Sequence, residues 1–391
     1  MKVIIHRGTH QIGGCITEIE SNKGTKIAID IGKNLPSINE KEEDKIEVEG
    51  LSVGVPDFKA IFVTHYHGDH IGLYNKINPK IPIYMGEISY QIFKILQNRL
   101  LQAKIISNED IKTIENFKTF KVKEKIKIDD ITITPFQVDH SAFDAYMFLV
   151  EYDGKRLLHT GDFRTHGQRG KAVIPTLEKY VKNVDCLICE GTTLSRKKEV
   201  PMTEFELQKE AEKIFKENKN NFVMCSSTNI DRIAAIHKAS ISAHKLFVCD
   251  EYQKEILKYV DSISRSYLYK FNRNVYSYDK NLDDIMNKNG FVMLVRDNWL
   301  SKNMLNKYPN NKFIYSQWEG YLNPKFTLYK HMQEFVPKEH IYLHTSGHAD
   351  YMSIKNVCET VKPKIIIPIH GENPEAFKEM RTKRINNKNI K

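Results

Sequence analysis

The length and composition of this chain limit the class of protein it can be. The sequence has 391 residues, of which 41% are hydrophobic and 28% charged, which is ordinary for a globular protein of two or three domains. No stretch approaches the ~20 apolar residues of a membrane span, and the first residues lack the features of a secretory signal. Six widely spaced cysteines indicate buried, reduced thiols in a cytoplasmic protein. We therefore expect neither a membrane protein nor a disulfide-rich secreted one.

The charge balance permits an acidic partner without requiring one. Lys and Arg number 59 and Asp and Glu 49, which gives a formal net charge of +10. A basic protein suits a polyanion, because neutralising phosphates releases counterions. Lys, Asn and Ile are also abundant throughout the sequence, and base composition alone can produce that surplus. Both interpretations stay open at this point.

The first predicted elements are short strands, and the last of them ends in an acidic residue. Strands are predicted over 2–6, 15–21 and 25–31, which are separated by turn residues such as Gly and Asn. Asp30 lies at the end of the third strand. An aspartate in such a place is often only a turn residue, so this run alone supports a turn as well as a site.

Ligand-type side chains are concentrated directly after the apolar strand predicted over 60–64. His65, His67, Asp69 and His70 lie within six consecutive positions. Imidazole nitrogens and carboxylate oxygens are ligands with which proteins bind Zn²⁺. Since burying so many polar groups without partners is costly, this density predicts a metal site.

Later strands end in residues of the same kind. Strands are predicted over 131–138, 145–152, 156–160, 184–189 and 364–368, and the residues that follow them include His140, Asp162, Glu190 and His370. Seven ligand-type side chains can hold two divalent ions that share one carboxylate: His65, His67, Asp69, His70, His140, Asp162 and His370. An isolated histidine on an apolar strand, such as His159 or His344, is more often a core residue.

From about Leu194 the sequence changes to alternating helices and strands. Helices are predicted over 203–219, 230–241 and 251–260, and strands over 221–225, 246–249, 290–295 and 312–315. This alternation is typical of an α/β domain with a parallel sheet. We therefore divide the chain into a first part, 1–193, a second domain, 194–340, and a returning segment, 341–391.

The motifs taken together resemble those of a known superfamily. His65-x-His67-x-Asp69-His70 resembles the HxHxDH signature of the metallo-β-lactamase superfamily. Glu190, Ser346-Gly347-His348-Ala349 and Ile369-His370-Gly371-Glu372 resemble the three additional motifs of its β-CASP subgroup of nucleases. The resemblance implies an α/β fold in which a β-CASP domain is inserted into a metallo-β-lactamase αββα sandwich.

The resemblance also implies a role for each motif residue. One ion would bind His65, His67 and His140, and the other Asp69, His70 and His370, with Asp162 as the bridge. Asp30 and Glu190 would orient ligands. His348 would stabilise or protonate the reacting phosphate, so that Asp69, Asp162 and His348 are the catalytic set. The implied cofactors are two Zn²⁺ ions, with Mn²⁺ or Mg²⁺ as alternatives, and the nucleophile is a metal-bound hydroxide.

Two further features concern the nucleic acid. His370 resembles the RNA-acting branch of the subgroup, and the last motifs are most similar to ribonuclease J. The chain ends soon after His370, where that family adds a C-terminal domain that helps dimerisation, so we expect at most a possible homodimer. Residues 226–232 resemble a phosphate-contacting loop. The candidate RNA-binding residues are Ser227, Thr228, Asn229, Arg232, Ser346, Gly347 and His348. Thr228 or Asn229 can equally be a plain helix N-cap.

These expectations combine into one hypothesis and several alternatives. The hypothesis is a cytoplasmic, zinc-dependent ribonuclease that hydrolyses phosphodiester bonds of RNA, most readily single-stranded, as an endonuclease, a 5′→3′ exonuclease or both. The alternatives are a metallo-hydrolase of small thioesters or lactones, a DNA-acting β-CASP nuclease, and an RNA-binding protein without catalytic activity.

Overall fold

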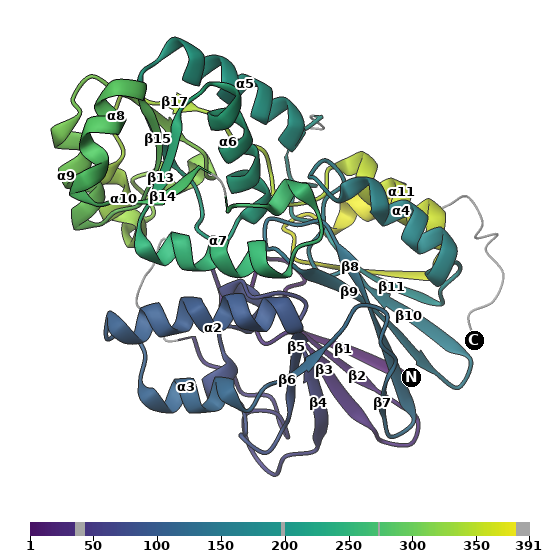
Figure 1. The fold of residues 1–391 in the computed structure, drawn as a ribbon. Coiled ribbons are helices and arrows are strands. Elements are labelled where there is room, and N and C mark those ends of the chain that lie inside the picture. The colour runs from purple at the N-terminus through teal and green to yellow at the C-terminus, as the bar shows by residue number, and fades with distance from the viewer. Residues whose placement is uncertain (36–43, 197–199, 273, 381–391) are drawn as a thin grey trace.

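The larger part of the molecule is built on two six-stranded sheets (Figure 1). The computed structural model describes residues 1–35, 44–196, 200–272 and 274–380. The first sheet follows chain order and consists of β1 (Lys2–Arg7), β2 (Ile16–Glu20), β3 (Lys26–Ile29), β4 (Phe58–Phe62), β5 (Ile83–Gly86) and β6 (Lys118–Phe120). β1 to β3 are antiparallel neighbours, whereas β3 to β6 run parallel.

The second sheet brings the far end of the chain back to its middle. Its strands are β7 (Ile126–Ile128), β8 (Ile131–Val138), β9 (Ala145–Tyr152), β10 (Lys155–His159), β11 (Cys186–Glu190) and β18 (Ile365–Ile369). β18 pairs in parallel with β11, so that Glu190 lies opposite Ile369. This pairing places residue 370 beside the loop that follows β11.

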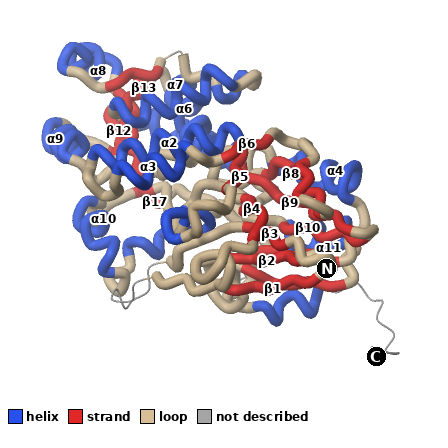
Figure 2. Tube along the Cα trace, turned by 90° about the horizontal axis from the view of Figure 1, so that it is seen from below, coloured by secondary structure: helices blue, strands red, loops and turns tan. Residues whose placement is uncertain are grey.

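The two sheets pack face to face, and helices cover their outer faces. Phe62 of the first sheet and Phe148 of the second meet at 5.8 Å between ring centroids in a shared apolar core. α2 (Glu87–Gln102) and α3 (Asn108–Glu115) lie against the first sheet, while α4 (Val173–Thr176) and α11 (Tyr351–Val361) lie against the second (Figure 2). β9 is almost entirely buried because both of its faces are covered. The predicted αββα sandwich is confirmed.

A third sheet of six strands carries a further set of helices. Its strands are all parallel and are β12 (Asn220–Met224), β13 (Leu246–Cys249), β14 (Val275–Ser277), β15 (Phe291–Val295), β16 (Lys312–Tyr315) and β17 (Ile341–Tyr342). The helices are α5 (Glu204–Glu217), α6 (Ile230–Ser242), α7 (Glu251–Ile263), α8 (Asp283–Asn289), α9 (Trp299–Lys307) and α10 (Lys330–Phe335). This confirms the predicted parallel sheet.

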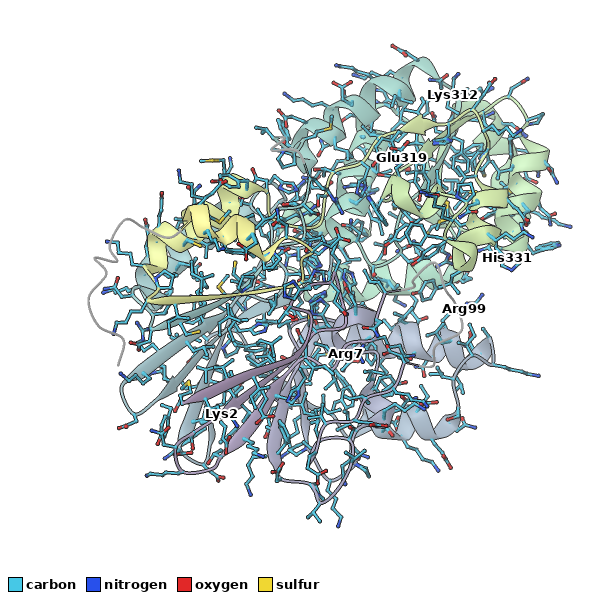
Figure 3. All side chains as sticks on the ribbon, turned by 180° about the vertical axis from the view of Figure 1, so that it is seen from behind. Lys2, Arg7, Arg99, Lys312, Glu319 and His331 are labelled. Carbon is cyan, nitrogen blue, oxygen red and sulfur yellow. The ribbon has the colours of Figure 1, made fainter. Side chains whose placement is uncertain are left out.

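The third-sheet part stands beside the sandwich. Figure 3 shows Lys2 and Arg7 on the sandwich, and Lys312 and Glu319 on the third-sheet part. The predicted boundaries at 194 and 341 stay predictions, and residues 381–391 of the predicted returning segment lie outside the described residues. Among the described residues, no helix is long and apolar enough to cross a membrane.

Candidate metal centre

Polar side chains gather at the edge where several strands of the sandwich end. β10, β11 and β18 run parallel to one another, and so do β3 and β4. The carboxyl ends of parallel strands meet at the same edge of a sheet. The residues at or just beyond the ends of β3, β4, β8, β10, β11 and β18 are Asp30, His65, His140, Asp162, Glu190 and His370.

One carboxylate oxygen lies at the centre of this edge. Oδ2 of Asp162 lies 3.1–3.9 Å from a ring nitrogen of each of five histidines, namely His65, His70, His140, His348 and His370. Burial alone would raise the pKa of Asp162, but His370, His70 and His348 hold it well below its usual value. The carboxylate is therefore ionised. It lies between the histidines of the two predicted ligand sets, where one carboxylate would be shared by two cations. We call these residues, with His67 and Asp69, the histidine–carboxylate cluster.

The first predicted ligand set converges on one point. The ligand atoms of His65, His67 and His140 lie within 4.8 Å of one another. Nε2 of His140 and Nδ1 of His67 are 3.3 Å apart. Burial lowers the pKa of His67 to about 4, and burial with the neighbouring His70 and His140 lowers the pKa of His65 well below its usual value. The rings are thus neutral, which is the form that binds a metal ion.

The second predicted set joins residues from opposite ends of the chain. Oδ2 of Asp69 lies 3.1 Å from Nε2 of His370 and 3.9 Å from Nε2 of His70. Burial would lower the pKa of His70, but Asp162, Asp30 and Asp69 raise it well above its usual value. A metal ion at this place would compete with that proton for the ring nitrogen.

Two buried ring nitrogens in the cluster make no hydrogen bond of good geometry within the described residues. They are Nε2 of His65 and Nε2 of His70, which lie 3.9 and 3.1 Å from Oδ2 of Asp162. A buried polar atom without a partner costs ~1–3 kcal/mol. A divalent cation would satisfy both nitrogens, and imidazoles with carboxylates form a donor set that zinc accepts. The cluster therefore fits a metal centre.

Asp30 fixes the orientation of His70. Its carboxylate accepts hydrogen bonds from the amide and hydroxyl of Thr64 at 2.7 and 2.9 Å, and lies 2.8 Å from Nδ1 of His70. Asp30 has a φ of +62°, which aspartate tolerates better than most residues. Since Nδ1 of His70 is held in this way, its Nε2 is left for the centre of the cluster.

Thr192 also positions the cluster, although the sequence analysis assigned it no role. Its Oγ1 donates to Glu190 at 2.7 Å and lies 2.8 Å from Nδ1 of His370 and 3.2 Å from Nδ1 of His348. Glu190 in turn accepts a hydrogen bond from the amide of Phe163 at 2.8 Å and lies 3.1 Å from Nδ1 of His348. The only sequence signal was the position of Thr192 directly after a strand that ends in Glu.

The predicted phosphate-contacting loop before α6 is occupied by protein contacts. Asn229 is the N-cap of α6 and accepts a hydrogen bond from the amide of Arg232 at 3.2 Å. Ser227 accepts one from Arg296 at 2.9 Å. Arg232 is 0% exposed, because both oxygens of Glu204 accept from its guanidinium at 2.9 and 3.0 Å. In this structure Arg232 is thus a buried ion-pair partner that has no surface to offer a phosphate, contrary to its predicted contact role.

Gly347 positions His140 through its main chain, and Ser346 contacts His348 through its hydroxyl. Nδ1 of His140 donates to the carbonyl of Gly347 at 2.6 Å, which leaves Nε2 of His140 for the cluster. A Cβ at residue 347 would lie 2.5 Å from Oγ of Ser141, so this approach requires glycine. The hydroxyl of Ser346 accepts a hydrogen bond from the amide of His348 at 3.0 Å.

A second buried cluster joins these loops to the third-sheet part. Arg164 donates to Asp139 at 2.8 Å and to Glu204 at 2.9 Å, and Glu204 also binds Arg232. All four side chains are fully buried. Burial alone would raise the pKa of Glu204, but Arg232 and Arg164 hold it at about 2. We call these four residues the arginine cluster; Asp139 precedes the predicted ligand His140.

Models of two protein families match this chain. A beta-lactamase superfamily domain matches residues 42–225, and a Zn-dependent metallo-hydrolase RNA specificity domain matches residues 338–386. The chain thus carries a beta-lactamase superfamily domain together with an RNA-specificity domain. The organisation of the chain fits the ribonuclease J-like β-CASP group, which confirms the predicted resemblance. The second matched domain belongs to zinc-dependent metallo-hydrolases, and this match implies a metal cofactor.

Curated relatives agree with these two domain matches. Ribonuclease J of Helicobacter pylori is 22% identical over 96% of this chain and 56% of its own length. Ribonuclease J of Mycoplasma genitalium is 26% identical over 97% and 69%, and an RNase J-like protein of Methanocaldococcus jannaschii is 25% identical over 95% and 93%. The chain thus spans about half of the Helicobacter protein.

A solved structure shows the same fold. It is a protein of unknown function from Enterococcus faecalis V583, with a TM-score of 0.74 and 19% identity. The match covers 96% of this chain and 95% of the other. At this identity the likeness speaks for the architecture alone.

Proposed function

We propose that the protein is a zinc-dependent ribonuclease that hydrolyses phosphodiester bonds of RNA. One observation carries this proposal: an oxygen of Asp162 lies 3.1–3.9 Å from ring nitrogens of five histidines. In the proposed site His65, His67 and His140 would hold one divalent ion, Asp69, His70 and His370 would hold another, and Asp162 would be shared. Two such ions, when bound, acidify a water molecule and neutralise charge on the phosphodiester.

The residues around the ions complete the proposed reaction. Burial alone would lower the pKa of His348, but Glu190 and Asp162 raise it, which favours the protonated ring. A protonated imidazole can donate its proton to the oxygen that leaves phosphorus. Thr192 and Glu190 contact Nδ1 of His348 and fix the ring for that transfer.

RNA is the proposed substrate because of the relatives and the RNA-specificity match. The proposed mode is endonucleolytic, 5′→3′ exonucleolytic or both, on single strands. Ser227, Thr228, Ser346, Gly347 and His348 stay candidates for RNA contacts. A cytoplasmic location is proposed because the six cysteines are all unpaired.

An end-labelling experiment tests this proposal and its mode. Metal-loaded protein is incubated with RNA labelled at either end and carrying a 5′-monophosphate, triphosphate or hydroxyl. Mononucleotides released from the 5′ side mean exonuclease, and discrete internal fragments mean endonuclease. RNA that stays intact in every case, while a thioester or lactone is turned over, would replace this proposal with the small-molecule alternative.

A further inference from the structure

A cavity lies on the third-sheet part, at the carboxyl end of α6. Its volume is about 740 Å³, within the range of pockets that hold a small organic ligand. Residues of α6, of the β13 strand and of the segment between α7 and β14 line it. Neither the histidine–carboxylate cluster nor the arginine cluster contributes to its walls.

The walls of this cavity are strongly basic. Lys238, Lys245 and Lys270 line it together with two histidines, and none of its described lining residues is acidic. Within the described chain, neither Lys238 nor Lys245 forms a salt bridge with a carboxylate, and Lys270 donates to a main-chain carbonyl of Asp261 at 2.6 Å. Burial and the nearby Lys219 lower the pKa of Lys245. Positive charge gathered in a concave surface attracts anions.

An exposed aromatic ring stands beside these lysines. Tyr267 lines the cavity and is 80% exposed, and Nζ of Lys238 lies 5.8 Å from the centroid of its ring. Tyr276 and Asn274 are further lining residues. Aromatic rings next to basic side chains are the features with which proteins bind single-stranded nucleic acid, the rings for bases and the cations for phosphates.

A structural explanation accounts for only part of this arrangement. Lysines near the carboxyl end of a helix interact favourably with the helix dipole, which suits Lys238 and Lys245. Lys270 and Tyr267 come from a different segment of the chain, after α7. The helix dipole does not explain why Tyr267, which is 80% exposed, lies beside the basic cavity. A free phosphate would leave this ring unused, and a nucleotide strand would not.

The position of the cavity suits an RNA strand whose other end enters the metal centre. The first turn of α6 contacts the segment that leads to His348, because Arg232 donates to the carbonyl of Thr345 at 3.0 Å. The helix has 13 residues, which corresponds to about 20 Å at ~1.5 Å per residue. We infer that this cavity binds single-stranded RNA at a distance from the cleaved bond. The inference rests on the proposed ribonuclease function.

Salt dependence of RNA binding tests the inference. Zinc-loaded protein carries His348→Ala in every variant to stop cleavage, and the dissociation constant for RNA of about 20 nucleotides is measured by fluorescence anisotropy over a range of salt. The variant Lys238→Gln/Lys245→Gln should bind roughly tenfold more weakly, and the salt slope should fall by about 2. Tyr267→Ala should weaken binding about fivefold or more with little change in slope.

Matched variants and a short substrate separate the outcomes. Lys258→Gln/Lys338→Gln removes the same charge from exposed positions of the same part that do not line the cavity, and should leave the slope unchanged. With His348 intact, cleavage of RNA of about 4 nucleotides should be equal in all of these variants, because so short a strand cannot reach the cavity. Circular dichroism confirms that each variant folds.

Two results would overturn the inference in distinguishable ways. If the cavity variants bind long RNA with the affinity and slope of the control variant while short RNA is still cleaved, the cavity is no RNA site and the proposed function stands. If no RNA is bound or cleaved by any form of the protein, the proposed function fails and the inference fails with it.

Discussion

The two buried clusters use the same kinds of charged group in opposite ways. In the arginine cluster Arg164 and Arg232 meet Asp139 and Glu204 in hydrogen-bonded pairs, so that the charges neutralise one another. In the histidine–carboxylate cluster, buried ring nitrogens such as Nε2 of His65 make no hydrogen bond of good geometry in the described chain. A satisfied cluster holds two parts of the fold together, whereas an unsatisfied one is prepared for a ligand. Substitutions can break or sharpen this contrast.

The largest effect is expected from Asp162→Ala. Removing the shared carboxylate should lower the zinc content and reduce RNA cleavage roughly 10³-fold or more, because residues that act as one catalytic unit fail together. Metal analysis and single-turnover cleavage measure both effects. Asp284→Ala, an exposed aspartate in the first turn of α8, is the control and should leave both unchanged. An Asp162 variant with full metal content would contradict the view that the histidine–carboxylate cluster is prepared for metal ions.

Glu204→Ala should instead reduce stability. It leaves the guanidinium groups of Arg164 and Arg232 buried without their shared carboxylate, which costs about 3–5 kcal/mol. Urea unfolding measures this loss, and the fraction that stays folded should keep its zinc. The control Glu206→Ala removes an exposed capping-box carboxylate of the same helix and should cost much less than Glu204→Ala. Equal losses for the two variants would contradict the role assigned to the arginine cluster.

The same carboxylate predicts how stability depends on pH. The pKa of Glu204 is about 2 in the folded protein against 4.5 for an ordinary glutamate. A lowered folded pKa contributes stability above the unfolded value, and this contribution is lost as the pH falls from about 4.5 towards 2. The loss amounts to at most about 3 kcal/mol. We expect the free energy of unfolding of the natural chain to decline more steeply below about pH 4.5 than that of Glu204→Gln.

A smaller effect is expected at Tyr66, between two predicted ligands. Its hydroxyl donates to the carbonyl of Thr228 at 2.9 Å and accepts from the amide of Phe143 at 2.7 Å, which links the metal-site loop to the third-sheet part. Tyr66→Phe removes both bonds and should lower stability by about 1–2 kcal/mol. Chemical denaturation measures this. An unchanged midpoint would show that the link contributes nothing to holding the parts together.

The smallest effect sets the scale for the others. Lys216 and Glu212 form an ion pair one helical turn apart on the exposed face of α5. Because water screens such a pair, Lys216→Ala should cost no more than about 0.5 kcal/mol in the same unfolding assay. A cost comparable with that of Glu204→Ala would mean that burial does not distinguish the arginine cluster from the surface.

Local patterns in the sequence were enough for the parallel sheet, whereas the sandwich was predicted from the resemblance of the motifs to a known superfamily. The strand predicted over 246–249 matches β13, because apolar runs bounded by helices follow from periodicity alone. The cluster around His65 could be predicted because its members are neighbours in the chain. That Asp162 and His370 come close to it depended on the resemblance, and the ligand assignment stays a prediction.

Contacts between distant segments could not be predicted in the same way. Arg232 follows a strand–loop–helix turn, and this local setting suits a phosphate contact as well as a buried ion pair. The partners that bury the arginine, Glu204 and the carbonyl of Thr345, come from other parts of the chain. Thr192 is a similar case, because two of its partners, His348 and His370, lie 156 and 178 residues away in the sequence.

Cleavage of RNA before and after removal of metal tests the central claim most directly. Purified protein is assayed with labelled RNA as isolated, after chelation and after zinc is restored, beside Asp162→Ala. We expect cleavage to stop on chelation, to return with zinc and to be absent from the variant throughout. Cleavage that survives chelation, or that Asp162→Ala performs as well as the natural chain, would contradict a metal-dependent ribonuclease built on this cluster.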